Sequence, residues 1–250
     1  MKIEEYFNEI GKRVDIVYGA AREAREKGLD PKKIVEIPLA KSLAERVVGL
    51  ISNVYPQLRN SEIVEFISKL EKEYGKLDPA VCLKIAEGIA SERFCKFESK
   101  FIAIDAGIRM GLAYLTLGVV SSPIEGFTEL KICKRRDSKE YFSPYYSGPI
   151  RSAGGTGAAF SLVIVDHLRE IFGYEVYDPD EQEIKRSVTE VLDYHERVTN
   201  LQYLPSEEET TFLASNLPMQ INGEPSEDRE VFNYKDLQRI ETNLIRGGFC

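Results

Sequence analysis

The apolar residues of the chain change their spacing near residue 120, and this change constrains the fold more than any other feature. Before it, apolar side chains recur every three or four residues, which is the spacing of amphipathic helices. After it, short segments typical of β-strands alternate with further helices. The pattern predicts an α+β protein, in which a helical N-terminal region is followed by an α+β region with a small, mainly antiparallel sheet.

Start and stop signals divide the first part of the chain into helices. The first helix is expected to end at Gly28, and an extended connector is expected over 34–40, where Pro38 breaks any helix. Further helices are expected at about 42–53, 61–74, 79–92 and 98–117, with Ser61 and Asp78 as caps of the second and third of these four. We therefore predict three regions: a helical assembly region over 1–55, a helical part of the core over 56–120, and an α+β part of the core over 121–250.

Beyond residue 120 the sequence predicts a hairpin and then mixed structure. Strands are expected at 126–136 and 140–147, and helices at 156–172, from the cap Asp180 to about 200, and from the cap Ser206 to about 215. The stretches PMQINGE and LQRIETNLIR, over 218–224 and 237–246, are expected to be extended. A strand approaching a glycine turn is an unusual place for a domain to end, so the chain is expected to be an N-terminal piece of a longer protein.

The first helix carries apolar residues in alternating steps of four and three, which we call the seam. Its members are Ile3, Phe7, Ile10, Val14, Val17, Ala21 and Ala24. A repeat of 3.5 residues is typical of coiled-coil pairing. Two interpretations stay open: a helix packed on its own domain, and a docking or dimerisation helix. The seam from Ile3 to Ala21 supplies our candidate assembly residues.

The segment SGPIRSAGGTGAA places several glycines directly before an apolar helical run. Backbone N–H groups at a helix N-terminus form an anion site, and glycines let the backbone approach a phosphate closely. The candidate phosphate contacts are Arg151, Ser152, Gly154, Gly155 and Thr156. No Lys-Ser/Thr pair follows the glycines, so the segment is not a nucleotide-binding P-loop. Phosphate contact and a tight structural turn both stay open.

The expected hairpin is basic and is followed by tyrosines. Its candidate DNA contacts are Lys131, Lys134, Arg135, Arg136, Lys139, Tyr145 and Tyr146. Cations neutralise phosphates and aromatic rings stack on bases, which is the combination that single-stranded nucleic acid requires. The opposing interpretation is a solvated hairpin edge protected by lysines. The net charge of −8 argues against a protein that coats nucleic acid nonspecifically, so any DNA contact is expected to be local.

No self-contained active site is visible in the sequence. The acidic stretch that includes Glu183, Glu190, Asp193 and Glu196 indicates the outer face of an amphipathic helix. Asp193, His195 and Glu196 lie at positions i, i+2 and i+3, which do not converge on one metal ion. The four cysteines form no C-x-x-C pair, which favours reduced intracellular thiols. No apolar run approaches the about 20 residues of a membrane span. For this segment we predict no catalytic residue, no metal, no cofactor and no membrane contact, and a cytoplasmic location.

Four separate stretches resemble the N-terminal portion of the large subunit of the archaeal family D DNA polymerase. They are GVVSSPIEG, YYSGPIRSAGGTGAA, LDYHERVTNLQYLPSEEE and ETNLIRGG, while VEIPLAKSLAERV and the first helix are similar but weaker. The resemblance covers essentially the whole chain and is most specific from Gly118 to Gly248. One residue departs from the pattern: Gly157 stands where relatives often have alanine, which loosens the first helical turn.

The resemblance implies a replicative, DNA-directed DNA polymerase built from this large subunit and a small subunit with 3′–5′ exonuclease activity. It also implies metal-dependent nucleotidyl transfer, with Mg²⁺ expected in the full polymerase. Because the family's catalytic carboxylates and zinc-binding cysteines lie much further along the subunit, this segment is expected to be an accessory domain. Its expected partners are DNA, the small exonuclease subunit and a second copy through the first helix. The competing hypothesis is a purely structural docking module without DNA contact.

Overall fold

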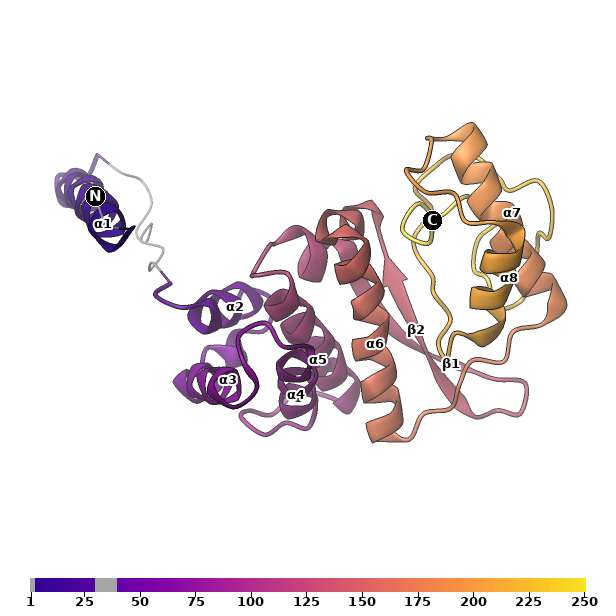
Figure 1. The fold of residues 1–250 in the computed structure, drawn as a ribbon, viewed down its shortest axis with the longest axis horizontal. Helices are drawn as coiled ribbons and strands as arrows, with labels where there is room; N and C mark the ends of the chain where they lie inside the picture. Colours follow the sequence, from indigo (N-terminus) through magenta and orange to yellow (C-terminus); the bar gives the residue numbers. More distant parts are fainter. Residues whose placement is uncertain (1–2, 30–39) are drawn as a thin grey trace. The chain divides into compact units, whose positions relative to one another are not determined.

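The computed structural model describes residues 3–29 and 40–250, and the chain separates into two units (Figure 1). The first unit spans Met1–Ala40 and the second spans Lys41–Cys250. The extended connector expected over 34–40 lies almost wholly outside the described residues. The division into three regions, with boundaries at residues 55 and 120, stays a prediction.

The described part of the first unit is dominated by the helix α1, Ile3–Glu26. An ion pair between Lys27 and Glu23, four residues apart, supports its last turn. None of the described residues of α1 is buried. Within this unit Ile3, Phe7, Ile10 and Val17 of the seam are exposed, whereas Val14, Ala21 and Ala24 are half-buried.

The second unit begins with a group of helices whose starts follow local capping chemistry. They are α2 (Leu43–Ile51), the 3₁₀ turn η1 (Pro56–Leu58), α3 (Ser61–Tyr74), α4 (Pro79–Ala90) and α5 (Lys100–Leu115). The side chain of Asp78 accepts a hydrogen bond from the backbone N–H of Ala80, which confirms Asp78 as the cap of α4. The expected cap Ser61 is wrong, because Asn60 accepts from the first turn and Ser61 is already helical.

A hairpin, two short helical turns and three further α-helices form the other regular elements of the second unit. The elements are the π-helical turn η2 (Ser121–Gly126), β1 (Phe127–Lys134), β2 (Glu140–Tyr146), the 3₁₀ turn η3 (Gly148–Ala153), α6 (Gly154–Phe172), α7 (Glu181–Arg197) and α8 (Glu207–Asn216). The two strands pair antiparallel, with Phe127 opposite Tyr146 and Lys134 opposite Glu140. The predicted α+β fold, with a helical N-terminus and a small antiparallel sheet, is confirmed.

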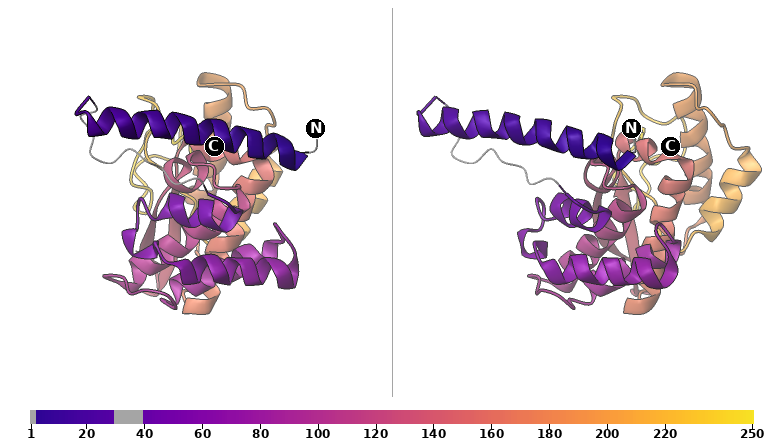
Figure 2. Two further views of the ribbon diagram at one scale, coloured as in Figure 1. Left: turned by 90° about the vertical axis from the view of Figure 1, so that its left-hand side faces the viewer. Right: turned by 60° about the vertical axis from the view of Figure 1, so that its left-hand side comes forward.

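The helix α6 lies between the hairpin and the helices α4 and α5, which it contacts on one side (Figure 1). Both figures place α7 and α8 on the other side of α6 and the hairpin from α2–α4 (Figures 1 and 2). One buried apolar cluster runs through the unit, from Ala44 in α2 to Met219 after α8. The helical part and the hairpin therefore share a core.

Arg109 joins these two parts at the turn η2. Its side chain is 6% exposed, and it donates hydrogen bonds to the Asp105 carboxylate and to the carbonyl oxygens of Pro123 and Phe127. A guanidinium has five N–H donors in a fixed fork, so it can satisfy a carboxylate and several carbonyl groups at once. Arg109 thus fixes where the chain turns from α5 into β1.

The extended strands expected over 218–224 and 237–246 are wrong as strands. Within the described residues these segments form only isolated bridges, between Tyr145 and Asn222 and between Glu230 and Leu244. Backbone hydrogen bonds still join the first segment to β2, from the N–H groups of Gln220 and Asn222 to the carbonyl oxygens of Phe142 and Pro144. The second segment is also held by a side chain, because Arg246 is bound to the Glu190 carboxylate of α7.

No helix within 3–29 and 40–250 combines the length and the apolar character of a membrane span.

Candidate functional site

The four sequence stretches that carry the resemblance come together around Arg151. Its Nη2 donates a hydrogen bond to the Tyr194 hydroxyl at 2.7 Å, and its Nη1 donates to the carbonyl oxygen of Gly247. The neighbouring Ser152 hydroxyl is hydrogen-bonded to the Ser121 hydroxyl at 2.5 Å. One residue from each stretch is therefore held at a single place, and we take this place as the candidate site.

Two glycines at the site have different reasons for lacking a side chain. A Cβ on Gly248 would lie 1.9 Å from the carbonyl oxygen of Tyr146, so only glycine lets the two backbones cross there. Gly155, in contrast, has a φ outside the left-handed region, and a Cβ on it would meet nothing within 4 Å. A close backbone contact therefore explains Gly248. No such contact explains Gly155, whose backbone faces open space.

The first turn of α6 is open to solvent and is not capped by a side chain. Gly154, Gly155 and Thr156 are exposed, and the residue before them, Ala153, provides no side-chain acceptor among the described residues. In each of the other α-helices of the second unit a side chain of Ser, Asn or Asp accepts from the first turn. The N–H groups of α6 together with the helix dipole can therefore bind an anion from solvent. The helix begins at Gly154, two residues before the expected start.

Most cations of the hairpin are bound to carboxylates. The pairs are Lys131 with Glu241 at 2.8 Å, Arg135 with Asp137 at 3.3 Å, Arg136 with Asp180 at 2.7 Å, and Lys139 with Glu175 at 2.7 Å. The Lys139 ammonium lowers the pKa of Glu175, as its hydrogen bond to that carboxylate requires. Lys134 is exposed and is the hairpin cation that has no ion pair among the described residues. These pairs favour the solvated hairpin edge over a free basic patch.

The base-stacking role of Tyr145 and Tyr146 is corrected by the structure. Their side chains are 2% and 3% exposed, so neither ring offers a face to a base. The Tyr145 hydroxyl accepts a hydrogen bond from the Asn222 amide, and the Tyr146 hydroxyl is hydrogen-bonded to Ser161. Burial raises the pKa of Tyr145 to about 12. The physical reason is that β2 is buried from Tyr141 to Tyr146 instead of facing solvent on alternate residues.

The acidic stretch in α7 is also oriented differently from the prediction. Three of its carboxylates point inward and are 5% exposed or less, namely Glu183, Glu190 and Asp193, while Glu196 lies on the outer face. Arginines bind the inward groups: Glu183 pairs with Arg239, Glu190 with Arg246, and Asp193 with Arg197. The expected acidic outer face is therefore wrong for these three residues.

The side chains present do not fit a metal ion such as Mg²⁺. Within residues 3–29 and 40–250, no three His, Cys, Asp or Glu side chains come together as ligands would. The ring Nδ1 of His195 accepts a hydrogen bond from the backbone N–H of Leu201, so only its Nε2 is left to bind a metal ion. No step of nucleotidyl transfer is therefore assigned to these residues.

A family model described as DNA polymerase II large subunit DP2, N-terminal, matches residues 5–250. The chain belongs to this family. It is 46% identical to the DNA polymerase II large subunit of Nanoarchaeum equitans over 98% of the chain. It is 43% identical to that of Methanococcoides burtonii over 100% of the chain. It is 40% identical to the DNA polymerase II large subunit of Pyrococcus horikoshii over 99% of the chain. The resemblance inferred from the four stretches is confirmed.

The chain spans about a fifth of the length of the curated relatives that it matches, 20% for the Nanoarchaeum protein and 17% for the Pyrococcus protein. The part of the large subunit present is its N-terminal part. The residues around Arg151, the first turn of α6 and the seam of α1 therefore belong to the N-terminal part of a polymerase large subunit.

Proposed function

We propose that this segment is an accessory assembly domain of a DNA polymerase large subunit, and that α1 pairs with α1 of a second copy. The observation that supports this most strongly is the exposed seam. Ile3, Phe7 and Val17 are 76%, 64% and 68% exposed, although they are apolar and recur at the coiled-coil spacing. When a second helix covers such a face, apolar surface is removed from water and the free energy of the pair falls.

Charge along α1 supports a second copy as the occupant of the seam. Residues 3–9 carry three glutamates and no basic residue, whereas residues 22–27 carry three basic and two acidic residues, a net charge of +1. In an antiparallel pair the acidic end of one helix lies beside the basic end of the other. The same helix is therefore complementary to itself, whereas docking on another protein requires a partner of matching charge pattern.

Replacing Phe7 and Val14 together by aspartate tests the pairing. Each change removes an apolar side chain worth roughly 1.5–3 kcal/mol on burial, so the association constant is expected to fall by a factor of about 100 or more. Sedimentation velocity of the 250-residue chain, run over a range of concentrations, measures the effect.

The matched control changes Asn8 to aspartate and Lys12 to glutamine, which alters the net charge equally on the opposite face of α1. The control is expected to associate as the unchanged chain does. A wild-type chain that sediments as a monomer at every concentration would contradict self-association. Loss of binding to the small subunit with an unchanged monomer would instead assign the seam to that subunit.

A second candidate function, DNA backbone contact, is supported by the uncapped first turn of α6. Backbone N–H groups and the Thr156 hydroxyl lie on neighbouring residues of this open turn, a combination that suits one phosphate. We propose contact with the sugar–phosphate backbone rather than with bases, because the two tyrosines are buried. The paired hairpin cations would add only weak long-range attraction.

Changing Thr156 to glutamate tests this contact without weakening the helix. A carboxylate in the first turn stabilises a helix but repels a phosphate. We expect DNA affinity to fall roughly 3–10-fold at low salt, while thermal stability is kept. The slope of the logarithm of the binding constant against the logarithm of the salt concentration is expected to decrease in magnitude by about one, the value for one phosphate contact. The control Gln57→Glu adds the same charge at an exposed site on η1 and is expected to bind DNA as before. Equal affinities for the two variants would rule out a phosphate at α6.

The name shared by the relatives extends the proposal to the whole protein. We propose that the full large subunit acts as a DNA-directed DNA polymerase in replication, with Mg²⁺ bound outside this segment. The associated small subunit with 3′–5′ exonuclease activity is proposed as its partner. Template-directed synthesis by the full subunit, tested with and without Mg²⁺, checks this reading.

A further inference from the structure

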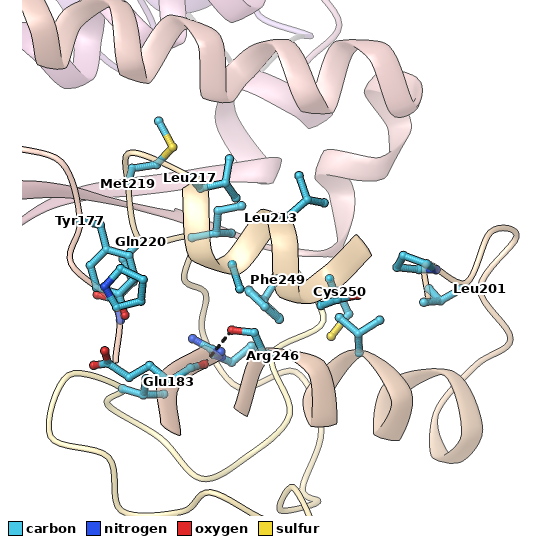
Figure 3. A pocket seen from close by; sticks show the side chains of 18 of the residues that line it. Tyr177, Glu183, Leu201, Leu213, Leu217, Met219, Gln220, Arg246, Phe249 and Cys250 are labelled. Atoms are coloured by element: carbon cyan, nitrogen blue, oxygen red, sulfur yellow. Dashed lines mark hydrogen bonds between the residues drawn. The ribbon is translucent and has the colours of Figure 1, made fainter. Parts of the chain in front are cut away.

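A largely apolar pocket of about 210 Å³ opens between α7, α8 and the segment that follows them (Figure 3). Val191 of α7, Leu213 of α8, and Leu217, Met219 and Phe249 of the later segment line it. Figure 3 shows Leu213, Leu217 and Phe249 among the side chains that line the pocket. The pocket is separate from the residues around Arg151 that form the candidate site.

The charged and amide side chains in the pocket wall are already bound to other groups. Glu183 accepts hydrogen bonds from Arg239, and Arg246 is held by Glu190. Gln220 accepts from the Tyr141 hydroxyl and donates to the carbonyl oxygen of Arg239. These groups have little capacity left for a polar ligand, so the pocket fits an apolar side chain better than a nucleotide.

Exposed apolar side chains surround the mouth of the pocket. Tyr203 is 68% exposed and Leu213 is 50% exposed, and both line the pocket. Only Thr210 of α8 is buried, so this short helix leaves most of its apolar residues in water. Neighbouring apolar side chains that remain exposed are typical of a protein interaction surface.

The surface around the pocket is strongly acidic. Residues 175–250, which include the residues that line the pocket, contain 17 acidic and seven basic residues, a net charge of −10, although three of the acids are buried against arginines. Glu207 and Glu208 are exposed in the first turn of α8, close in sequence to the apolar rim. This field repels the phosphates of a nucleic acid and attracts a cationic partner.

We propose that the α7–α8 surface docks a basic peptide segment of a partner protein. A leucine, isoleucine, phenylalanine or tryptophan of that segment fills the pocket, and flanking lysines or arginines lie on the acidic rim. The apolar anchor supplies most of the affinity, and the charges supply the association rate and the preference for a basic partner. This inference is independent of the roles proposed for α1 and α6.

The test selects a phage-displayed library of random 12-residue peptides on the complete 250-residue chain. The recovered peptides are expected to carry one large apolar residue with at least two lysines or arginines nearby.

Fluorescence anisotropy with the most enriched peptide then compares the affinities of variants of the chain. Leu213→Ser is expected to weaken binding about 10-fold or more. Joint replacement of Glu207 and Glu208 by glutamine is expected to weaken it about 3–10-fold at low salt and little at high salt.

The control Val163→Ser removes an exposed apolar side chain from α6, where it is 45% exposed, and is expected to leave binding unchanged. Tyr203→Ser serves as a second rim variant if Leu213→Ser unfolds at a lower temperature. A library without enrichment, or enriched peptides without basic residues, would overturn the proposal. Equal peptide affinity for the unchanged chain and both rim variants would overturn it as well. Binding of an apolar dye without enrichment of any peptide would also overturn it, because that result indicates a small apolar ligand.

Discussion

Replacing Arg109 with methionine is expected to lower the free energy of unfolding of the second unit by about 3–5 kcal/mol. The guanidinium is buried, lies 2.6 Å from the Asp105 carboxylate, and donates at 2.9 Å and 2.7 Å to the carbonyl oxygens of Pro123 and Phe127. Methionine occupies a similar volume but donates no hydrogen bond. It leaves three carbonyl groups, the third being that of Thr128, without this donor, and the buried Asp105 carboxylate keeps only the hydrogen bond from the Tyr55 hydroxyl.

Chemical denaturation followed by circular dichroism measures this change. Arg59→Met is the matched control, because Arg59 is exposed and its side chain forms no ion pair among the described residues. Its effect is expected to stay within about 0.5 kcal/mol. Similar unfolding midpoints for the two variants would show that the turn from α5 into β1 does not depend on the buried guanidinium.

Local chemistry made most helix starts predictable from the sequence. Asp78 followed by Pro79, Asp180 and Ser206 each begin a helix where expected, since a cap depends only on the few residues after it. The hairpin was predictable for the same reason, because both strands and the turn lie within one short segment. Signals that act over a few residues can be read without knowing the tertiary fold.

The burial of charged and aromatic residues could not be predicted in this way. Glu183 is buried because Arg239, 56 positions later, binds its carboxylate. No pattern in the residues around Glu183 predicts this pairing. Tyr145 was expected at the surface beside basic residues, yet Asn222, 77 positions later, bonds to its hydroxyl inside the fold. The nearly continuous apolar and aromatic run of β2 was the one signal that indicates a strand buried on both faces.

The candidate site shows the same division between local and long-range information. The glycine-rich segment was recognised as a helix start, but its helix begins two residues earlier, at Gly154. Arg151 was predicted to contact phosphate, whereas the structure shows two of its nitrogen atoms bound to Tyr194 and Gly247, 43 and 96 positions away. Phosphate contact by the first turn of α6 stays a prediction, since only the openness of that turn supports it.

Replacing Glu190 with alanine is expected to destabilise the second unit by about 3–5 kcal/mol at neutral pH. The carboxylate is fully buried and accepts hydrogen bonds from the Arg246 guanidinium at 2.6 Å and from the Arg246 backbone N–H at 2.8 Å. Arg186 lies 3.3 Å away on the same helix, and both arginines are 1% exposed. Alanine leaves two buried positive charges without their shared partner.

The control on the same helix is Glu196→Ala, because Glu196 is exposed and forms no ion pair among the described residues. It is expected to change the free energy of unfolding by less than about 0.5 kcal/mol. Denaturation of both variants at pH 7 gives the comparison. A loss for Glu190→Ala no larger than that of the control would mean that the two arginines find other acceptors or water.

The pH dependence separates the charge of Glu190 from its volume. Burial alone would raise the pKa of Glu190, but the Arg246 and Arg186 guanidiniums hold that pKa below its usual range. Because the pKa is lowered in the folded state, the stabilisation is complete above the ordinary glutamate pKa of about 4.3 and disappears as the pH falls through the lower folded value.

Glu190→Gln, which cannot titrate, is therefore expected to be less stable than the unchanged chain at pH 7. The difference narrows below about pH 4, as urea denaturation across this range measures. A gap that stays constant with pH would show that shape, and not charge, makes glutamate necessary between the two arginines.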